Sequence, residues 1–131
     1  MKIDAPSFHL GIAEFNRQEF YECHESLEEY WQTLSVDVAH KELIQGIIQI
    51  AVAFYHLRRN NVKGALKLLV RGNGRLAAYL PASAGLELAE CSEAVALDIA
   101  LIEAGCAFDD ARLKIPTIQN KLVYLGYTTS V

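Results

Sequence analysis

The sequence of 131 residues lacks several features that would assign a protein class at once. Its three cysteines are odd in number and include no Cys-x-x-Cys pair, so it predicts neither a disulfide framework nor a cysteine zinc site. Basic residues number 12 against 16 acidic ones, a balance that argues against a general nucleic-acid binder. Charged residues make up 21% and hydrophobic ones 52%, which excludes a disordered chain.

Long apolar runs are missing as well. Residues 1–10 have no apolar segment typical of a signal peptide. The most apolar stretch, residues 43–57, contains two glutamines and a histidine and is shorter than the roughly 20 residues of a membrane span. We therefore expect a cytoplasmic protein with no membrane association and with reduced thiols. The length predicts one domain over residues 1–131.

Helical periodicity is present through most of the chain, and a few residues divide it. Asn16 followed by Glu19 resembles an N-cap with a capping box. The pair Asn60-Asn61 is expected to end one helix and cap the next, while Pro81 and Gly105 end two others. The expected helices cover residues 17–33, 38–59, 62–80 and 86–104, with a loop over 82–85.

The C-terminal tail, residues 106–131, is less regular. Pro116 and Gly126 interrupt it, and a short helix is expected near Ile118–Leu125. The sequence thus predicts an all-α fold: an antiparallel bundle of about four to five helices, with its core over residues 14–105 and an irregular tail over 106–131.

The first expected helix carries the most distinctive polar pair. When it is drawn with about 100° per residue, Phe20 and Leu27 define the apolar face, His24 lies within that face and Glu28 lies at its border. Residues four apart on a helix are neighbours, and a His–Glu pair is half of a site for Zn, Mn, Fe or Ni. The alternative is a hydrogen-bonded structural pair beside Trp31.

The second expected helix is apolar on most of its circumference, apart from a narrow polar seam of Gln45, Gln49 and His56. This seam either faces water or faces the His24–Glu28 pair across a close helix contact that Gly46 and Ala53 would permit. In the second case His56 becomes a third candidate metal ligand. The residues expected to line or support the site are Tyr21, Trp31, Gln45 and Gln49.

These residues resemble a known family. The run Phe15-Asn16, Phe20-Tyr21-Glu22-Cys23-His24-Glu25, Leu27-Glu28 and Trp31 is similar to the HxxxExx(W/Y) signature of the domain-of-unknown-function family numbered 309. The similarity continues through residues 45–51 and through Asn61, Gly64 and Ala65, and it covers about residues 15–85. It implies a small helical prokaryotic protein in which His24 and Glu28 are suspected metal ligands.

Charge is strongly segregated along the chain. From Arg58 to Arg75 there are six basic residues and no acidic one, whereas residues 14–29 and 87–110 are rich in acids. A spacing of four places one basic stripe on the third expected helix, formed by Lys63, Lys67, Arg71 and Arg75. The stripe is a candidate anion-binding surface for a phosphate, nucleotide or RNA. The alternatives are pairing with acidic neighbours in the same chain and self-association, for example as a homodimer.

Two functions follow as expectations. The first is a metal-binding protein acting on an unidentified small molecule, as a metal-dependent hydrolase whose ion activates a water molecule. The second is a non-catalytic helical interaction module in which His24, Glu28 and Gln49 form a structural polar network. An enzyme with Cys23 as nucleophile is a more distant third.

Overall fold

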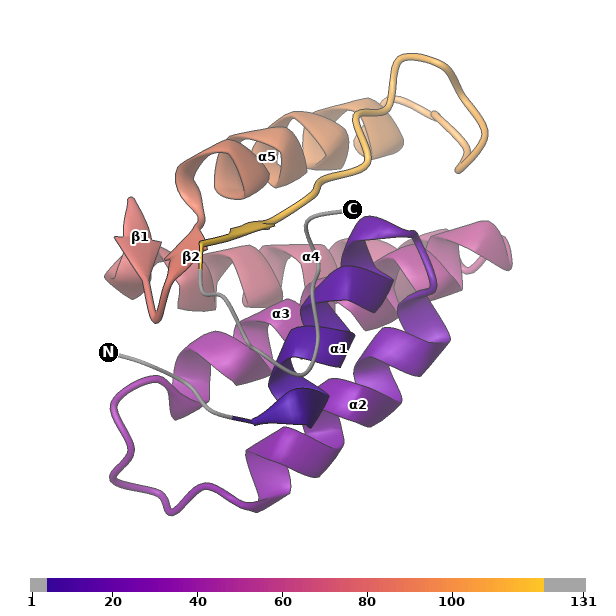
Figure 1. Cartoon of the computed structure of the whole chain (residues 1–131). Coiled ribbons are helices and arrows are strands. Elements are labelled where there is room, and N and C mark those ends of the chain that lie inside the picture. Colours follow the sequence, from indigo (N-terminus) through magenta and orange to yellow (C-terminus); the bar gives the residue numbers. More distant parts are fainter. Residues whose placement is uncertain (1–4, 122–131) are drawn as a thin grey trace.

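The structure, a computed structural model, describes residues 5–121 of the chain. Within this range five α-helices and a small three-stranded sheet form the fold, so the predicted helical class is confirmed (Figure 1). The helices are α1 (Pro6–Asn16), α2 (Phe20–Gln32), α3 (Lys41–Arg58), α4 (Val62–Leu76) and α5 (Ala89–Glu103). A 3-10 turn (Ala77–Tyr79) follows α4, and the strands are β1 (Ala82–Ser83), β2 (Leu86–Glu87) and β3 (Gln119–Asn120).

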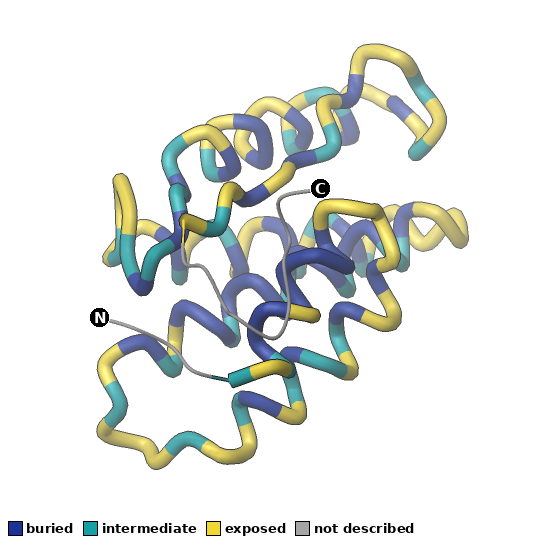
Figure 2. Tube along the Cα trace, in the orientation of Figure 1, coloured by how far each residue is buried: buried dark blue, intermediate teal, exposed yellow. Residues whose placement is uncertain are grey.

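Helix α1 is the main element that the sequence pattern did not predict. Pro6 occupies its first turn, where the missing N–H costs nothing. From Phe8 onward nearly every residue of α1 is buried, including His9 and Glu14 (Figure 2). A helix buried on most sides has no polar face, so the amphipathic periodicity that identifies surface helices is weak here. The core therefore begins before the predicted boundary at residue 14.

The predicted capping box at Asn16 is wrong. Asn16 is the last residue of α1, and α2 begins at Phe20 after a turn in which Gln18 has a φ of 62°. The Asn16 side chain bonds instead to the main chain of Ile118, donating from Nδ2 to the carbonyl at 2.8 Å and accepting from the amide at 2.7 Å. It thus holds the C-terminal segment and does not cap α2.

Helices α3 and α4 form a closely packed hairpin. Asn61 caps α4 as predicted, accepting a 3.1 Å hydrogen bond from the Gly64 amide. Gly46 of α3 lies against Gly72 of α4, and a Cβ on Gly46 would be 2.9 Å from the Cβ of Arg75. The close approach that Gly46 permits is therefore made to α4, and not to α2 as one of the two predicted alternatives required.

The segment after α4 is a β-hairpin where a loop was expected. Ala84 and Gly85, with φ of 54° and 80°, form a two-residue turn that joins β1 to β2. Helix α5 starts at Ala89, later than the predicted residue 86, and ends before Gly105, whose φ is 107°. Strand β2 also pairs antiparallel with β3, with Leu86 opposite Asn120.

The predicted helix near Ile118–Leu125 is wrong over residues 118–121, where the chain is extended and forms β3. The remaining residues of that prediction, 122–125, lie outside the described residues. The backbone amide of Lys114 bonds to Asp98 of α5, and Asn16 holds Ile118 of the same segment. The C-terminal segment, residues 114–121, therefore crosses the bundle as an anchored strap (Figure 1).

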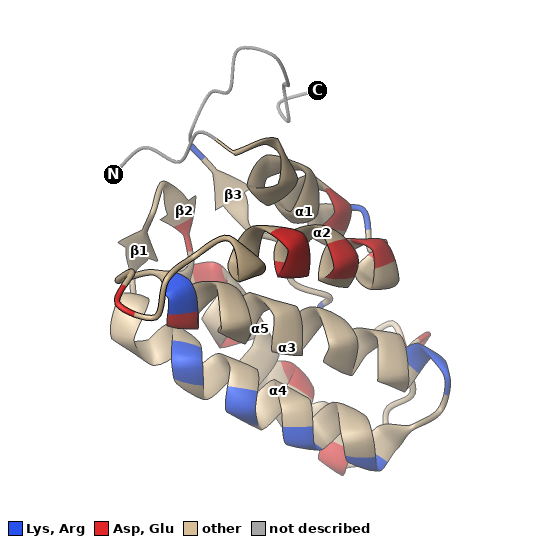
Figure 3. Cartoon of the chain, turned by 90° about the horizontal axis from the view of Figure 1, so that it is seen from below, with Lys and Arg blue, Asp and Glu red and all other residues tan. Residues whose placement is uncertain are grey.

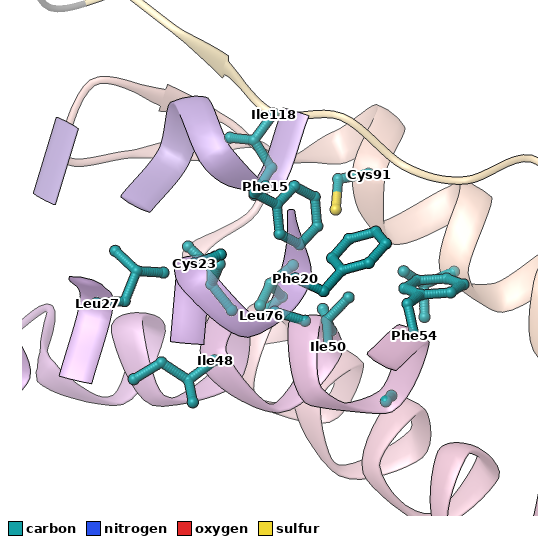
Figure 4. Packing of buried hydrophobic residues seen from close by; sticks show 14 of the residues in the cluster. Phe15, Phe20, Cys23, Leu27, Ile48, Ile50, Phe54, Leu76, Cys91 and Ile118 are labelled. Carbon is teal, nitrogen blue, oxygen red and sulfur yellow. The ribbon is translucent and has the colours of Figure 1, made fainter. Parts of the chain in front are cut away.

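One apolar cluster joins the helices and the strap (Figure 4). Phe20 stacks on Phe54 with ring centroids 5.5 Å apart, and Phe15 meets the edge of Phe20 at 5.8 Å. Cys91 of α5 and Ile118 of the strap close the cluster above these rings. No helix within residues 5–121 has both the length and the apolar character required to cross a bilayer.

Candidate functional site

The outer face of α2 carries the predicted His–Glu pair. His24 and Glu28 are one helical turn apart, and His24 Nε2 lies 2.8 Å from Glu28 Oε2. Their side chains are 32% and 46% exposed, so water and solutes reach both groups. The pair is thus formed within one helix by its spacing alone, and it is an ion pair when the imidazole is protonated.

A cavity of about 150 Å³ lies between α2 and α3 next to this pair. Its lining is aromatic and aliphatic apart from the two imidazoles, and it comprises Phe20, Tyr21, His24, Val52, Tyr55 and His56. The Tyr21 and Tyr55 rings lie 5.5 Å apart, and the Arg59 guanidinium lies 5.5 Å from the centroid of Tyr55. The fold therefore brings His24 and His56 to the same cavity, which the sequence analysis allowed as one of two alternatives.

A shallower hollow of about 300 Å³ lies on the other side of His24. Its lining is acidic and polar and comprises Tyr21, His24, Glu25, Glu28, Glu29 and Gln32. Gln32 Nε2 donates to Glu28 Oε1 at 3.5 Å, a long contact that leaves this oxygen accessible to other donors. Tyr21 and His24 separate an apolar cavity from an acidic hollow.

The other predicted site residues do not join this arrangement. Gln49 accepts a 3.4 Å hydrogen bond from Arg75 Nη1 of α4 and so lies on the α4 side of α3. Gln45 is half-buried on α3. Trp31 packs under the ammonium of Lys41, which is 4.1 Å from the ring centroid, and its buried Nε1 has no hydrogen-bond partner among residues 5–121. The structure thus brings together Tyr21, His24, Glu28 and His56, and places Gln49 elsewhere.

The site gathers fewer potential metal ligands than zinc sites in proteins usually have. Within residues 5–121 no group of three or more His, Cys, Asp or Glu side chains is arranged to hold a metal ion. Catalytic zinc sites use three protein ligands and structural ones use four. His24 and Glu28 form a two-ligand half-site, with His56 across the neighbouring cavity.

The basic stripe on α4 is present as predicted and faces outward (Figure 3). Lys63, Lys67 and Arg71 are exposed. Arg75 is half-buried, and its Nε lies 3.5 Å from Glu42 Oε1. Three of the four predicted anion-binding residues are therefore accessible, and the fourth is engaged within the chain.

Cys23 is unsuited to nucleophilic chemistry. It is fully buried, and burial together with the nearby charge of Glu14 raises the pKa of its thiol far above the ordinary range. A thiol reacts as the thiolate, so this cysteine is inert in the folded protein.

Besides His9 and Glu14 of α1, two buried polar side chains were not predicted from the sequence. His40 Nε2 and Tyr30 Oη share a 2.7 Å hydrogen bond, and burial lowers the pKa of His40. Asp98 is fully buried on α5, and burial raises its pKa to about 6. Asp98 follows Cys91 by seven residues and precedes Ile102 by four, so a helical projection of this segment would have placed it on the apolar face.

Comparisons with known proteins relate the first half of the chain to a family. Residues 8–68 match the family described as Domain of unknown function (DUF309), a range that begins earlier and ends earlier than the motif resemblance suggested. The chain is also 44% identical over 59 residues to "Uncharacterized protein YpuF" of Bacillus subtilis (strain 168), over 44% of this chain and 33% of the relative. The match thus spans about a third of that relative's length. The chain is a small helical protein whose residues 8–68 are similar to the DUF309 family.

Proposed function

We propose that this domain binds a small organic molecule in the cavity between α2 and α3. The observation that carries the proposal is the composition of this cavity: three aromatic rings and Val52 surround a space of about 150 Å³, and His24, held by Glu28, lies at its edge. Ligand sites are typically apolar concavities with a few placed polar groups. A cavity near 150 Å³ accommodates about one six-membered ring.

The His24–Glu28 pair supplies the polar recognition. In the neutral tautomer that carries its proton on Nε2, on the side of Glu28, His24 has Nδ1 as its acceptor. A ligand with one ring and one hydroxyl or N–H donor complements an apolar wall and an imidazole acceptor. We expect weak binding of the ring alone, with a dissociation constant of about 1 mM for a ligand of about seven heavy atoms.

Phenol is a suitable probe because it combines a ring with one O–H donor, and toluene is its matched analogue without the donor. The measurement is the shift of the Val52 methyl and Tyr55 ring signals in NMR spectra during titration. Phenol is expected to saturate these shifts at millimolar concentration and to bind more tightly than toluene. The preference for phenol should be lost in His24→Phe.

Two variants locate the binding. Val52→Phe fills the cavity and should weaken phenol binding at least about tenfold, since the added ring occupies the ligand's place. Val36→Phe is the matched control, because Val36 is exposed in the loop between α2 and α3. The proposal is wrong if no shift saturates, or if Val52→Phe binds phenol as well as the unmodified protein does.

A second candidate function is binding of a divalent metal ion by His24 and Glu28. The observation in its favour is that one nitrogen and one oxygen converge at 2.8 Å on an accessible helix face. Ligand atoms around tetrahedral zinc lie about 3.4 Å apart, from bond lengths near 2.1 Å, so a small side-chain adjustment would admit the ion. Zn, Mn, Fe and Ni all suit one imidazole and one carboxylate, with water or a bound molecule in the other positions. The metal-dependent hydrolase activity expected from the sequence would require this binding step.

Calorimetric titration of chelator-treated protein with Zn²⁺, Mn²⁺ and Ni²⁺ tests this second candidate. One ion per chain is expected, with the affinity lost in His24→Ala and in Glu28→Gln. Glu25→Gln serves as the matched control because it removes an equal charge next to the pair. Binding that survives His24→Ala, or that is absent altogether, contradicts the metal candidate without affecting the phenol test.

A further inference from the structure

The outer face of α4 carries a row of exposed cations. Lys63, Lys67 and Arg71 are exposed and spaced by four, which places them along one side of the helix at intervals of about 6 Å. Among residues 5–121 none of these three forms an ion pair. Val70, 56% exposed, lies in the same row. This face, residues 63–71 of α4, is referred to below as the basic face.

The outer face of α2 is its counterpart in charge. Glu22, Glu25 and Glu29 are exposed and lie on one side of the helix, and within the described range none of them forms an ion pair. Beside them are Tyr21, which is 48% exposed, and the hollow of about 300 Å³ that Glu25 and Glu29 help to line. This face, residues 21–29 of α2, is referred to below as the acidic face.

The two faces do not neutralise each other within the molecule. Helix α3 packs against both α2 and α4, and it lies between them in both views of the fold (Figures 1 and 3). The basic residues lie along the side of α4 away from α3, and the acidic residues of α2 lie beyond α3 from α4 (Figure 3). Each face is therefore open to another molecule, and the two faces carry opposite charge.

We propose that the basic face of one copy of the chain docks on the acidic face of a second copy. The hollow on α2 offers carboxylates to the long side chains of Lys67 and Arg71, while Val70 and Tyr21 supply apolar contact at the same interface. Because the two patches are different, the contact is heterologous, and each added copy leaves one basic and one acidic face free. The assembly is therefore expected to grow with concentration beyond a dimer unless it closes into a ring.

A polyanion such as RNA fits the basic face less well. The whole chain has a net charge of −4, so an extended polyanion that covers α4 also meets repulsion from the acidic helices. A second copy presents a patch of limited size with matching charge. Exposed ion pairs contribute little each and are screened by salt, so the association is expected to be weak and sensitive to ionic strength.

Sedimentation velocity of the full chain over a range of concentrations tests this. At about 20 mM salt the weight-average mass should rise above that of the 14.6 kDa monomer, and at about 0.5 M salt it should return to it. Lys67→Glu should lower the association constant at least about tenfold through removal of one cation and addition of a repulsive charge. Lys114→Glu, the same charge change on an exposed residue of the strap, should lower it less than about twofold.

Charge exchange identifies the partner surface. A variant with Lys67→Glu and Arg71→Glu, and another with Glu25→Lys and Glu29→Lys, should each be monomeric when alone, because both of its faces then carry the same sign. An equimolar mixture of the two should associate again, since each basic face then meets an acidic one. Circular dichroism of each variant confirms that the helices are retained.

The inference is independent of ligand binding in the apolar cavity, and three results would overturn it. One is a monomeric unmodified protein at low salt and millimolar concentration. Another is a charge-exchanged mixture that stays monomeric although both variants are folded. The last is a protein that does not self-associate but binds single-stranded RNA with loss of affinity in Lys67→Glu, which would assign the basic face to nucleic acid.

Discussion

The main-chain amide of Lys114 donates a 2.8 Å hydrogen bond to Oδ1 of Asp98, a residue with no solvent exposure. The other carboxylate oxygen, Oδ2, has no hydrogen-bond partner among residues 5–121. Burial raises the pKa of Asp98 to about 6, and the Lys114 hydrogen bond opposes this rise. The strap is therefore anchored to α5 by a carboxyl group whose ionisation is costly in the folded state.

This anchor predicts a stability that falls as the pH rises. The pKa of Asp98 is higher in the folded chain than its unfolded value near 3.9, so the folded chain holds more protons between these values. The resulting stabilisation is complete below about pH 4 and is lost as the pH rises through about 6. Asp98→Asn retains an oxygen for the Lys114 amide and cannot ionise. We expect it to raise the free energy of unfolding by about 1–3 kcal/mol near pH 7.5 and to change it little near pH 4.

Urea unfolding followed by circular dichroism at the two pH values measures this effect. Asp109→Asn is the matched control, because Asp109 is exposed and the substitution removes the same charge. The control should change the free energy of unfolding by less than about 0.5 kcal/mol. An Asp98→Asn variant that is less stable than the unmodified protein near pH 7.5 would contradict the assignment.

The buried pair of Tyr30 and His40 gives a prediction with the opposite pH dependence. Burial lowers the pKa of His40, so stability from this group is complete above its unfolded value near 6.5 and is lost as the pH falls toward the folded value. Tyr30→Phe leaves His40 Nε2 without its 2.7 Å partner, and we expect a loss of about 1–3 kcal/mol in the free energy of unfolding at neutral pH.

Tyr21→Phe is the control for this substitution, since Tyr21 is exposed and its hydroxyl is free to bond to water. Thermal or urea unfolding of the two variants side by side is the measurement. Equal stabilities of Tyr30→Phe and Tyr21→Phe would show that the hydrogen bond to His40 contributes nothing.

The local half of the candidate site could be predicted from sequence, and the interhelical half could not. His24 and Glu28 meet because they are four residues apart on one helix, a relationship that needs no tertiary information. The position of Gln49 depends on which helix covers each side of α3. Gly46 indicates that some helix approaches closely, but small residues do not specify which one, and the partner is α4.

Helices that are buried on most sides are also difficult to predict from the sequence pattern. Helix α1 buries His9 and Glu14 together with its apolar residues, so it has little of the polar–apolar contrast by which a surface helix is identified. Asp98 lies within the acid-rich residues 87–110, whose composition alone does not distinguish a buried carboxylate from exposed ones. Helical spacing is the more reliable guide there, because side-chain direction is set by the helix and not by the composition of the segment.

The Asn16 side chain yields a third prediction, which separates its observed role from that of an N-cap. Asn16→Ala removes both hydrogen bonds to Ile118, whose side chain is fully buried, and we expect a loss of about 1–3 kcal/mol in the free energy of unfolding. Hydrogen exchange should accelerate at the Ile118 amide and remain unchanged at the start of α2. Faster exchange confined to residues 20–23 would instead support the capping role.

The contact between α3 and α4 gives the last prediction. A Cβ on Gly46 would lie 2.9 Å from both the Arg75 Cβ and a Leu76 methyl carbon, and 3.0 Å from the Gly72 carbonyl oxygen, so Gly46→Ala must push the two helices apart. We expect it to lower the free energy of unfolding by about 1–3 kcal/mol in urea denaturation. Gly74→Ala on α4 is the matched control, because no atom lies within 4 Å of its added Cβ and alanine is the better helix former. The control should stabilise the protein by about 0.5–1 kcal/mol, and a stabilising Gly46→Ala would mean that the helix pair is looser than the glycine contact indicates.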